Sequence, residues 1–121
     1  QIDNACSRIS LRSPLCGSSI EVAIVVKDTI ITGYSQKITA CALGQASASI
    51  MANAVKGKSR NNIITVRDQV KVMLNSGVIN FEPDWIQLAC LLPAREAKAR
   101  HGAILLPFDA VLKAFGECEN N

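Results

Sequence analysis

Alternation of apolar and polar residues marks the early part of the chain, and this pattern is typical of half-buried β-strands. The first strand is carried by four apolar residues spaced two apart: Ile20, Val22, Ile24 and Val26. A turn at Lys27-Asp28 leads into a second strand that runs from 29 to about 38. Two strands joined by two residues form an antiparallel hairpin. Before them, residues 1–18 are polar and rich in turn-forming residues.

Beyond residue 40 the apolar residues recur at helical spacing, which predicts four helices. Their stripes are Leu43, Ala46, Ile50 and Ala54; Ile63, Val66, Val70 and Met73; Trp85, Leu88 and Leu92; and Leu105, Phe108, Leu112 and Phe115. Gly57 and Gly77 end the first two helices, Glu82-Pro83 opens the short third one, and Pro93 closes it. The last helix starts near Pro107 or bends there.

The order of the elements, strands first and helices after, predicts the α+β class. We expect a small antiparallel β-sheet of about three strands with the helices packed on one of its faces. At 121 residues the chain fits one domain, 1–121. Hydrophobic residues at 49% and charged residues at 19% supply a packed interior and argue against disorder.

The composition gives no sign of a nucleic-acid or membrane partner. Aromatic residues make up only 4%, and the formal charge of +3 is scattered along the chain rather than gathered in a run. The longest apolar stretch, 23–26, is far too short to cross a bilayer. One histidine and ten dispersed acidic residues give no Ser-His-Asp or paired-carboxylate arrangement for a hydrolase.

The cysteines are five in number, and their spacings match no compact disulfide framework. We therefore expect reduced thiols in a cytoplasmic protein, which makes metal or sulfur chemistry worth considering. Most single cysteines, however, are small buried hydrophobic residues. Cys6 lies in the polar N-terminal segment, Cys90 falls off the third helical stripe and Cys118 lies in an acidic tail, so we expect no site role for them.

Cys41 stands where the second strand ends and the first helix begins. The free N–H groups and the positive dipole end of a helix N-terminus favour a thiolate over a thiol. Such a thiolate is suited to ligating a metal or to carrying a persulfide. A buried structural cysteine at a strand–helix junction is the alternative interpretation.

Cys16 and His101 are the other candidate site residues. Cys16 lies between Pro14 and Gly17, which predicts a tight loop. Because the hairpin leaves this loop and returns toward Cys41, antiparallel pairing predicts that the two thiols share one site. His101 is the only histidine, although a single histidine is more often an ordinary surface or core residue than a ligand.

Four segments together resemble the U-type iron–sulfur scaffold family, which comprises IscU, SufU and the N-terminal domain of NifU. They are Pro14-Leu15-Cys16-Gly17-Ser18, similar to the family's Pro-x-Cys-Gly-Asp loop; the Ala- and Ser-rich helix opened by Cys41; its end at Val55-Lys56-Gly57-Lys58-Ser59; and Arg100-His101-Gly102. The resemblance covers 14–115 and implies an IscU- or NifU-like fold.

The resemblance also implies a function. Family members accept sulfur from a cysteine desulfurase, bind iron or a [2Fe-2S] cluster transiently, and hand the cluster to apo client proteins. They are scaffolds rather than enzymes with turnover of their own, and this chain could form a homo-oligomer. Carried over to this sequence, Cys41 is the expected persulfide acceptor, and Cys16, Cys41 and His101 are the expected ligands of the metal or cluster.

Two positions depart from the family pattern. Ser18 replaces the aspartate of the loop, and Gly102 replaces the third cysteine. A tetrahedral iron or zinc site takes four ligands, and only three candidates are visible here. Two alternatives therefore stand beside cluster assembly: a zinc-binding, SufU-like sulfur-transfer protein, and a family member that binds no metal and serves as an interaction module.

Overall fold

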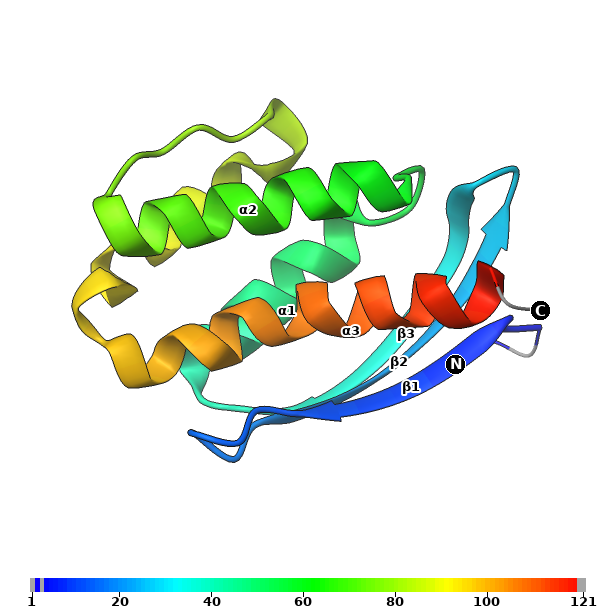
Figure 1. Ribbon diagram of the computed structural model, residues 1–121, viewed down its shortest axis with the longest axis horizontal. Coiled ribbons are helices and arrows are strands. Elements are labelled where there is room, and N and C mark those ends of the chain that lie inside the picture. Colours follow the sequence, from blue (N-terminus) through cyan, green and yellow to red (C-terminus); the bar gives the residue numbers. More distant parts are fainter. Residues whose placement is uncertain (1, 3, 120–121) are drawn as a thin grey trace.

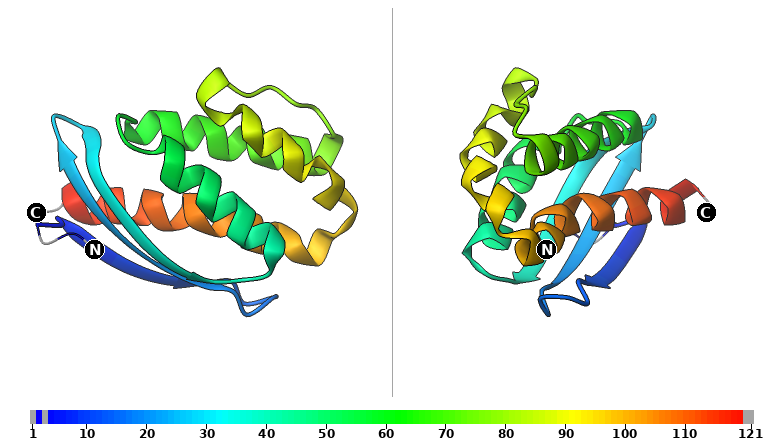
Figure 2. Two further views of the ribbon diagram at one scale, coloured as in Figure 1. Left: turned by 180° about the vertical axis from the view of Figure 1, so that it is seen from behind. Right: turned by 60° about the vertical axis from the view of Figure 1, so that its left-hand side comes forward.

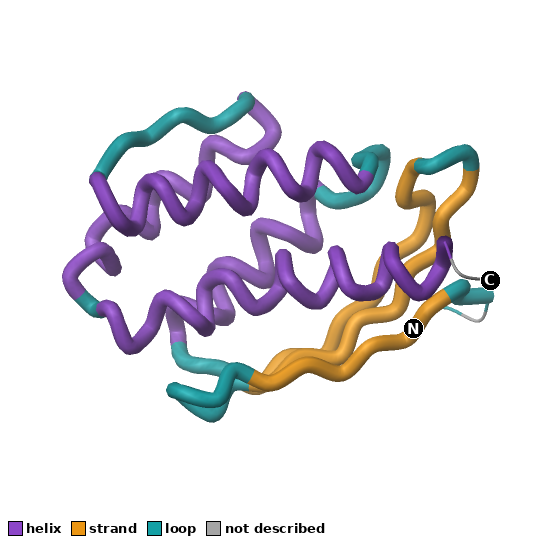
Figure 3. The backbone as a smooth tube through the Cα atoms, in the orientation of Figure 1, coloured by secondary structure: helices purple, strands orange, loops and turns teal. Residues whose placement is uncertain are grey.

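Three antiparallel strands form the sheet in the computed structural model, which describes residue 2 and residues 4–119. Strands β1 (Ser7–Arg12), β2 (Ser19–Lys27) and β3 (Ile30–Thr39) lie side by side in the order β1-β2-β3 (Figure 1; Figure 3). The other positions of the expected domain 1–121, namely 1, 3, 120 and 121, lie outside the described residues.

The turn between β2 and β3 consists of Asp28 and Thr29, one residue later than the sequence predicts. Their φ angles are 52° and 67°, and a two-residue turn with positive φ at both positions matches the twist of a hairpin. Across the hairpin, Ser19 pairs with Thr39 and Lys27 pairs with Ile30. The segments just before Ser19 and just after Thr39 therefore lie at the same end of the sheet.

Strand β1 lies within 1–18, where the sequence pattern indicates only turns. It pairs antiparallel with β2, so that Ser7 lies opposite Ile24 and Arg12 lies opposite Ser19. Its apolar side chains are only Ile9 and Leu11, and the remaining inward position is Ser7, which is buried. Two apolar residues are too few for a period of two to stand out in a polar segment.

Among the described residues, the helical segments all lie on one side of the sheet (Figure 1; Figure 2). They are α1 (Ala42–Ala54), α2 (Arg60–Ser76), the 3₁₀ helices η1 (Pro83–Glu96) and η2 (Lys98–Arg100), and α3 (His101–Glu119). Helices α3 and α1 contact the strands, and α2 and η1 pack on these two helices. This arrangement confirms the expected α+β class. None of these helices is long and apolar enough to span a membrane.

Local sequence sets both ends of α2. The side chain of Ser59 accepts a hydrogen bond from the backbone N–H of Asn62, and the side-chain oxygen of Asn62 accepts one from the N–H of Ser59. Gly77 follows the helix with φ 79°, a left-handed conformation that glycine adopts at little cost. The predicted stripe of this helix is confirmed, because all four of its residues are buried: Ile63, Val66, Val70 and Met73.

The predicted third helix is wrong in its period and in its end. Segment η1 is a 3₁₀ helix that continues to Glu96, with Pro93 inside it. Its buried residues are spaced three apart, as a helix with three residues per turn requires: Trp85, Leu88, Leu91 and Ala94. Leu92, which the α-helical period places on the inward face, is only half-buried.

Helix α3 is the central helix of the core. It begins at His101, well before Pro107, so this proline lies inside the helix and is buried. Phe108 and Phe115 of the predicted stripe are buried, whereas Leu105 and Leu112 are half-buried. The ring of Phe108 lies 6.1 Å from the ring of Trp85, which ties η1 to α3. The hydroxyl of Ser47 in α1 donates to a backbone carbonyl of α3 at 2.6 Å.

A disulfide bond joins Cys6 and Cys118, which corrects the expectation of reduced thiols at these two positions. The two cysteines are 112 residues apart in the sequence. Cys6 directly precedes β1 and Cys118 lies near the end of α3, so folding brings the start of β1 and the end of α3 together (Figure 1; Figure 2). Cys16, Cys41 and Cys90 are the free cysteines of the described chain.

Candidate thiol site

Cys16 and Cys41 lie at the same end of the sheet. Cys16 belongs to the loop between β1 and β2, and Cys41 follows β3. Because Ser19 pairs with Thr39, the two segments meet at the end of the sheet that lies away from the Cys6–Cys118 disulfide (Figure 1; Figure 2). That the two sulfurs share a metal or a cluster stays a prediction.

The loop that carries Cys16 is tightly closed. The backbone N–H of Ser13 donates to the carbonyl of Ser18 at 2.8 Å, and the N–H of Gly17 donates to the carbonyl of Ser13 at 3.0 Å. Gly17 has φ 71°, a left-handed conformation that residues with a Cβ adopt only with strain. Leu15 at the tip of the loop is 82% exposed, so the loop presents Cys16 next to an accessible apolar side chain.

Two serine hydroxyls surround the sulfur of Cys16. Its Sγ lies 3.3 Å from the Oγ of Ser13 and 3.2 Å from the Oγ of Ser18. These contacts lower the pKa of the Cys16 thiol to about 7, with the Ser13 hydroxyl as the largest cause and the Ser18 hydroxyl next. The backbone N–H of Ser18 and the charge of Arg100 act in the same direction, and desolvation opposes them.

Cys41 occupies the N-cap position of α1, with extended backbone angles. The backbone N–H of Gly44 is the largest cause that lowers its pKa, and the N–H of Leu43 and the Arg100 guanidinium add to it against desolvation. The electrostatics at this helix N-terminus therefore act in the direction that the sequence predicts.

Arg100 is a cation that acts on both thiols. It forms the last residue of η2, and its charge lowers the pKa of Cys16 as well as that of Cys41. Sequence reasoning missed Arg100 and Ser13 as site residues. Arg100 directly precedes His101 in a predicted ligand segment, and a cation at that place is the signal that could have revealed it. Ser13 carries no such signal, because its contact with Cys16 exists only in the folded loop.

His101 is the first residue of α3, and its ring is engaged by η1. Its Nε2 lies 3.0 Å from the backbone carbonyl of Ala94. A carbonyl oxygen only accepts hydrogen bonds, so Nε2 is the donor in this contact and is not free to ligate a metal ion. Ligation by His101 stays a prediction, and it would have to use Nδ1.

Comparison with known proteins places the chain in a family. The sequence model of the NifU-like N-terminal domain matches residues 2–84, more than half of the chain. The chain belongs to this family. The matched range contains both Cys16 and Cys41, whereas the helix that begins at His101 lies beyond it.

Solved structures agree with the NifU-like assignment. A NifU-like protein (N-terminal) from Brucella abortus is 33% identical and superposes with a TM-score of 0.93, over 100% of this chain and 84% of that one. A candidate iron–sulfur cluster assembly scaffold protein for the SUF system from Fervidobacterium islandicum AW-1 is 19% identical, with a TM-score of 0.80 over 94% of this chain and 83% of that one. The second likeness shows the fold alone. Among curated proteins, none matches the chain.

Of the two positions where this NifU-like chain departs from the family pattern, one contacts the Cys16 sulfur and the other borders the Ser13 hydroxyl. Ser18 contacts it directly, at 3.2 Å. A Cβ atom built on Gly102 would lie 2.7 Å from the Oγ of Ser13, and this same hydroxyl contacts Cys16. Ser18 therefore stands at the position where the resemblance expects an aspartate ligand. The hydroxyl of Ser13 lies beside position 102, where the resemblance expects a third cysteine.

The donor set does not fit a resident metal ion held by this chain alone. Within residue 2 and residues 4–119, no three His, Cys, Asp or Glu side chains are grouped closely enough to hold a metal ion. Cys16 and Cys41 provide two sulfur donors, whereas a serine hydroxyl is a poor ligand for iron or zinc and Gly102 offers none. The two cysteines could supply at most two of the four ligands of a tetrahedral site, and the others would have to come from elsewhere.

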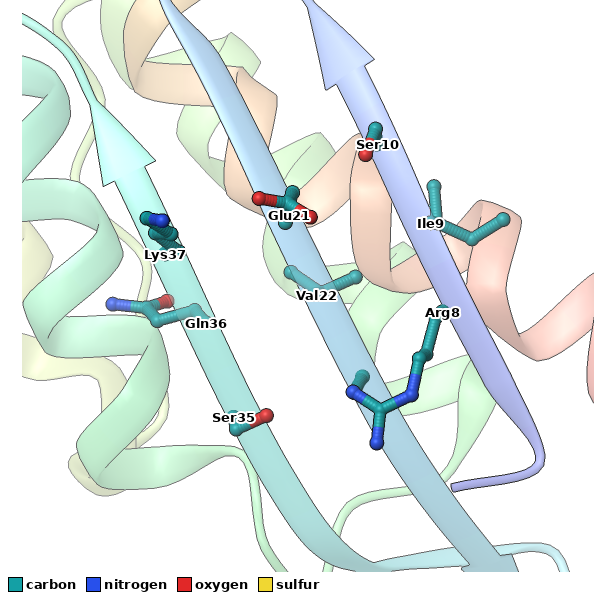
Figure 4. A pocket seen from close by; sticks show the side chains of 9 residues that line it. Arg8, Ile9, Ser10, Glu21, Val22, Ser35, Gln36 and Lys37 are labelled. Carbon is teal, nitrogen blue, oxygen red and sulfur yellow. The ribbon is translucent and has the colours of Figure 1, made fainter. Parts of the chain in front are cut away.

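The open face of the sheet carries a separate pocket of about 440 Å³ (Figure 4). Arg8, Glu21 and Lys37 line it from the three strands, and Glu21 pairs directly with Lys37 across the sheet. The described residues that line this pocket include no cysteine and no histidine. We assign this pocket no part in the sulfur chemistry.

Proposed function

We propose that the chain accepts sulfur at its thiol pair from a cysteine desulfurase and passes it into iron–sulfur cluster assembly. The observation that carries this proposal is the pair itself: Cys16 and Cys41 lie at one end of the sheet, and hydrogen bonds, with a smaller contribution from Arg100, lower the pKa of both. A thiolate is the form of cysteine that attacks sulfane sulfur. Membership in the NifU-like family supports the link to cluster assembly.

The transfer step needs no outside oxidant or reductant. A thiolate of the pair attacks the outer sulfur of the persulfide on the desulfurase cysteine. A new S–S bond forms on the acceptor, the S–S bond of the donor breaks, and the donor cysteine leaves as a thiolate. The outer sulfur and its proton stay on the acceptor, which becomes a persulfide. Cys41 is the acceptor expected from the sequence, and Cys16, with its pKa near 7, is an equal candidate.

Iron and the [2Fe-2S] cluster are cargo in this proposal. Cys16 and Cys41 supply two donors, with His101 as a third through Nδ1, and a second molecule supplies the rest. That molecule is the desulfurase, an apo client protein or a second copy of this chain. The chain acts as a scaffold and sulfur acceptor without turnover of its own.

The proposal places this work in the cytoplasm. The free thiols Cys16, Cys41 and Cys90 support a reducing compartment, because such thiols persist there. The Cys6–Cys118 bond points the other way, since disulfides are rare in reducing compartments. It is far from the thiol site, so the sulfur chemistry proposed for Cys16 and Cys41 does not depend on it.

A metal-free interaction module is the second candidate function, and Ser18 and Gly102 favour it. A chain that has lost two ligand positions could keep the family fold and a partner surface while taking up neither sulfur nor metal.

Anaerobic reconstitution tests the proposal. The protein is incubated with ferrous iron, L-cysteine and a cysteine desulfurase, and absorption spectra are combined with iron and sulfide analysis. We expect bound iron and sulfide in the wild type, none in Cys16→Ala or Cys41→Ala, and wild-type amounts in Cys90→Ala, which removes an exposed free thiol. Zinc in the purified protein without iron or sulfide favours the SufU-like alternative, and no uptake of any kind favours the interaction module.

A further inference from the structure

The sulfur of Cys16 is held by hydroxyl groups that are themselves out of solvent. Ser13 is 5% exposed and Ser18 is 3% exposed. A thiol has a single hydrogen, so it can donate to only one of the two oxygens at 3.3 and 3.2 Å, and the other hydroxyl is left to donate to the sulfur. Once the thiol loses its proton, both hydroxyls can turn to donate to it.

The hydroxyl of Ser13 and a side chain at position 102 exclude each other. A Cβ on Gly102 would approach the Ser13 Oγ to 2.7 Å, closer than two such atoms pack. The Cβ of Ser13 lies 3.8 Å from the same point, which is an ordinary contact. Only the hydroxyl conflicts with an added Cβ, so Gly102 leaves the space in which Ser13 reaches Cys16.

We propose that Ser13 and Ser18 are positioning residues for sulfur acceptance at Cys16, which therefore proceeds without a bound metal ion. The inference rests on the proposed function and specifies how this chain performs it. The two hydroxyls orient the sulfur and stabilise its negative charge, the tasks for which a metal ion would otherwise serve. Gly102 contributes to the same arrangement, because its lack of a side chain leaves space for the Ser13 hydroxyl.

The covalent step is balanced without a metal. The Cys16 thiolate attacks the outer sulfur of a persulfide, the donor S–S bond breaks, and the donor sulfur leaves as a thiolate. The acceptor then holds the transferred sulfur with its proton. During the attack, negative charge moves away from the Cys16 sulfur, and the hydroxyls keep it aligned with the breaking bond.

Glutathione persulfide provides a test that requires no partner protein. The protein is treated with this donor in excess EDTA, and again after zinc is added, and the mass gain of one sulfur atom on the Cys16 peptide is followed over time. We expect the wild type to react in EDTA at a rate that zinc does not raise. Ser13→Ala and Ser18→Ala should each slow the reaction by about tenfold, the effect of losing a hydrogen bond to a charged group.

A matched control and a double substitution separate positioning from folding. Ser7 is also buried, and its hydroxyl has no hydrogen-bond partner within the described part of the chain, so Ser7→Ala should react like the wild type. Gly102→Ala pushes the Ser13 hydroxyl aside and should slow the reaction as much as Ser13→Ala does. The two changes together should cost no more than either one alone. Thermal unfolding of each variant verifies that it folds.

The possible results separate a failure of this inference from a failure of the proposed function. Sulfur acceptance by Cys16 only in the presence of zinc, transfer to Cys41 alone, or equal loss in Ser7→Ala and Ser13→Ala overturns the inference and leaves the proposed function standing. Additive losses from Ser13→Ala and Gly102→Ala overturn it as well. If neither Cys16 nor Cys41 gains sulfur, with or without zinc, the proposed function fails together with the inference.

Discussion

Removing the Cys6–Cys118 disulfide should destabilise the fold strongly. The bond closes a loop over a sequence separation of 112 residues, and the chain-entropy relation then gives a stabilisation of roughly 5 kcal/mol at 25 °C. A domain of this size is stable by about 5–15 kcal/mol in total. We therefore expect the variant Cys6→Ala/Cys118→Ala to lose at least a third of its free energy of unfolding while keeping the same fold.

Urea unfolding measures this loss, with the fluorescence of Trp85 as the probe because this tryptophan is buried. With an m-value of about 1.5 kcal/mol/M, a loss of roughly 5 kcal/mol lowers the midpoint by about 3 M. A phosphine reductant should lower the wild-type midpoint to that of the double variant and leave the double variant unchanged. Cys90→Ala, which removes an exposed free thiol, is the control and should unfold like the wild type.

The decisive comparison combines the midpoint with a count of thiols. If the wild type unfolds at the same urea concentration with and without the reductant, although labelling shows that all five cysteines have become free, the loop-closure reasoning is refuted. If five free thiols are found before any reductant is added, the pair is not formed in the protein as purified.

Three further predictions concern the thiol site and its support. Iodoacetamide labelling of metal-free protein should show the rate at Cys16 rising with pH to half its maximum near pH 7, because its pKa is lowered to about 7; Ser13→Ala should move this midpoint upward. Gly102→Cys combined with Ser13→Gly should retain iron and sulfide longer against a chelator than the wild type does, and Cys41→Ala should abolish binding in both backgrounds. Ser47→Ala removes a buried hydrogen bond between α1 and α3 and should lower the free energy of unfolding by about 1 kcal/mol, measured with urea.

Periodicity predicted those elements whose apolar residues repeat often enough. The hairpin of β2 and β3 and the helix α2 each present several regularly spaced apolar residues, and each was found. Strand β1 has only Ile9 and Leu11, so its pattern is lost among serines and arginines. The period of η1 was predicted wrongly because Trp85 and Leu88 suit both a 3₁₀ and an α-helical period. Whether Leu91 or Leu92 is the next buried residue depends on tertiary packing.

The local sequence was enough to select Cys16 and Cys41 as candidate site residues. The flanking Pro14 and Gly17 indicate that Cys16 lies on a tight loop. The junction between a strand and a helix indicates that Cys41 lies at a helix N-terminus. Ser13 carries no equivalent signal, because its contact with Cys16 exists only in the folded loop, and Arg100 offers only its position beside His101. The pairing of Cys6 with Cys118 is the extreme case, since only the complete fold brings these two distant positions together.

The most direct test of the account is to map the sulfur that a cysteine desulfurase delivers. The protein is incubated with the desulfurase and L-cysteine without iron, the persulfides are trapped by alkylation, and the peptides are analysed by mass spectrometry. The account predicts that the added sulfur lies on Cys16 or Cys41 and that Cys90, although exposed and free, carries none. Sulfur on Cys90 in equal measure, or no protein-bound sulfur while the desulfurase turns over, would contradict it.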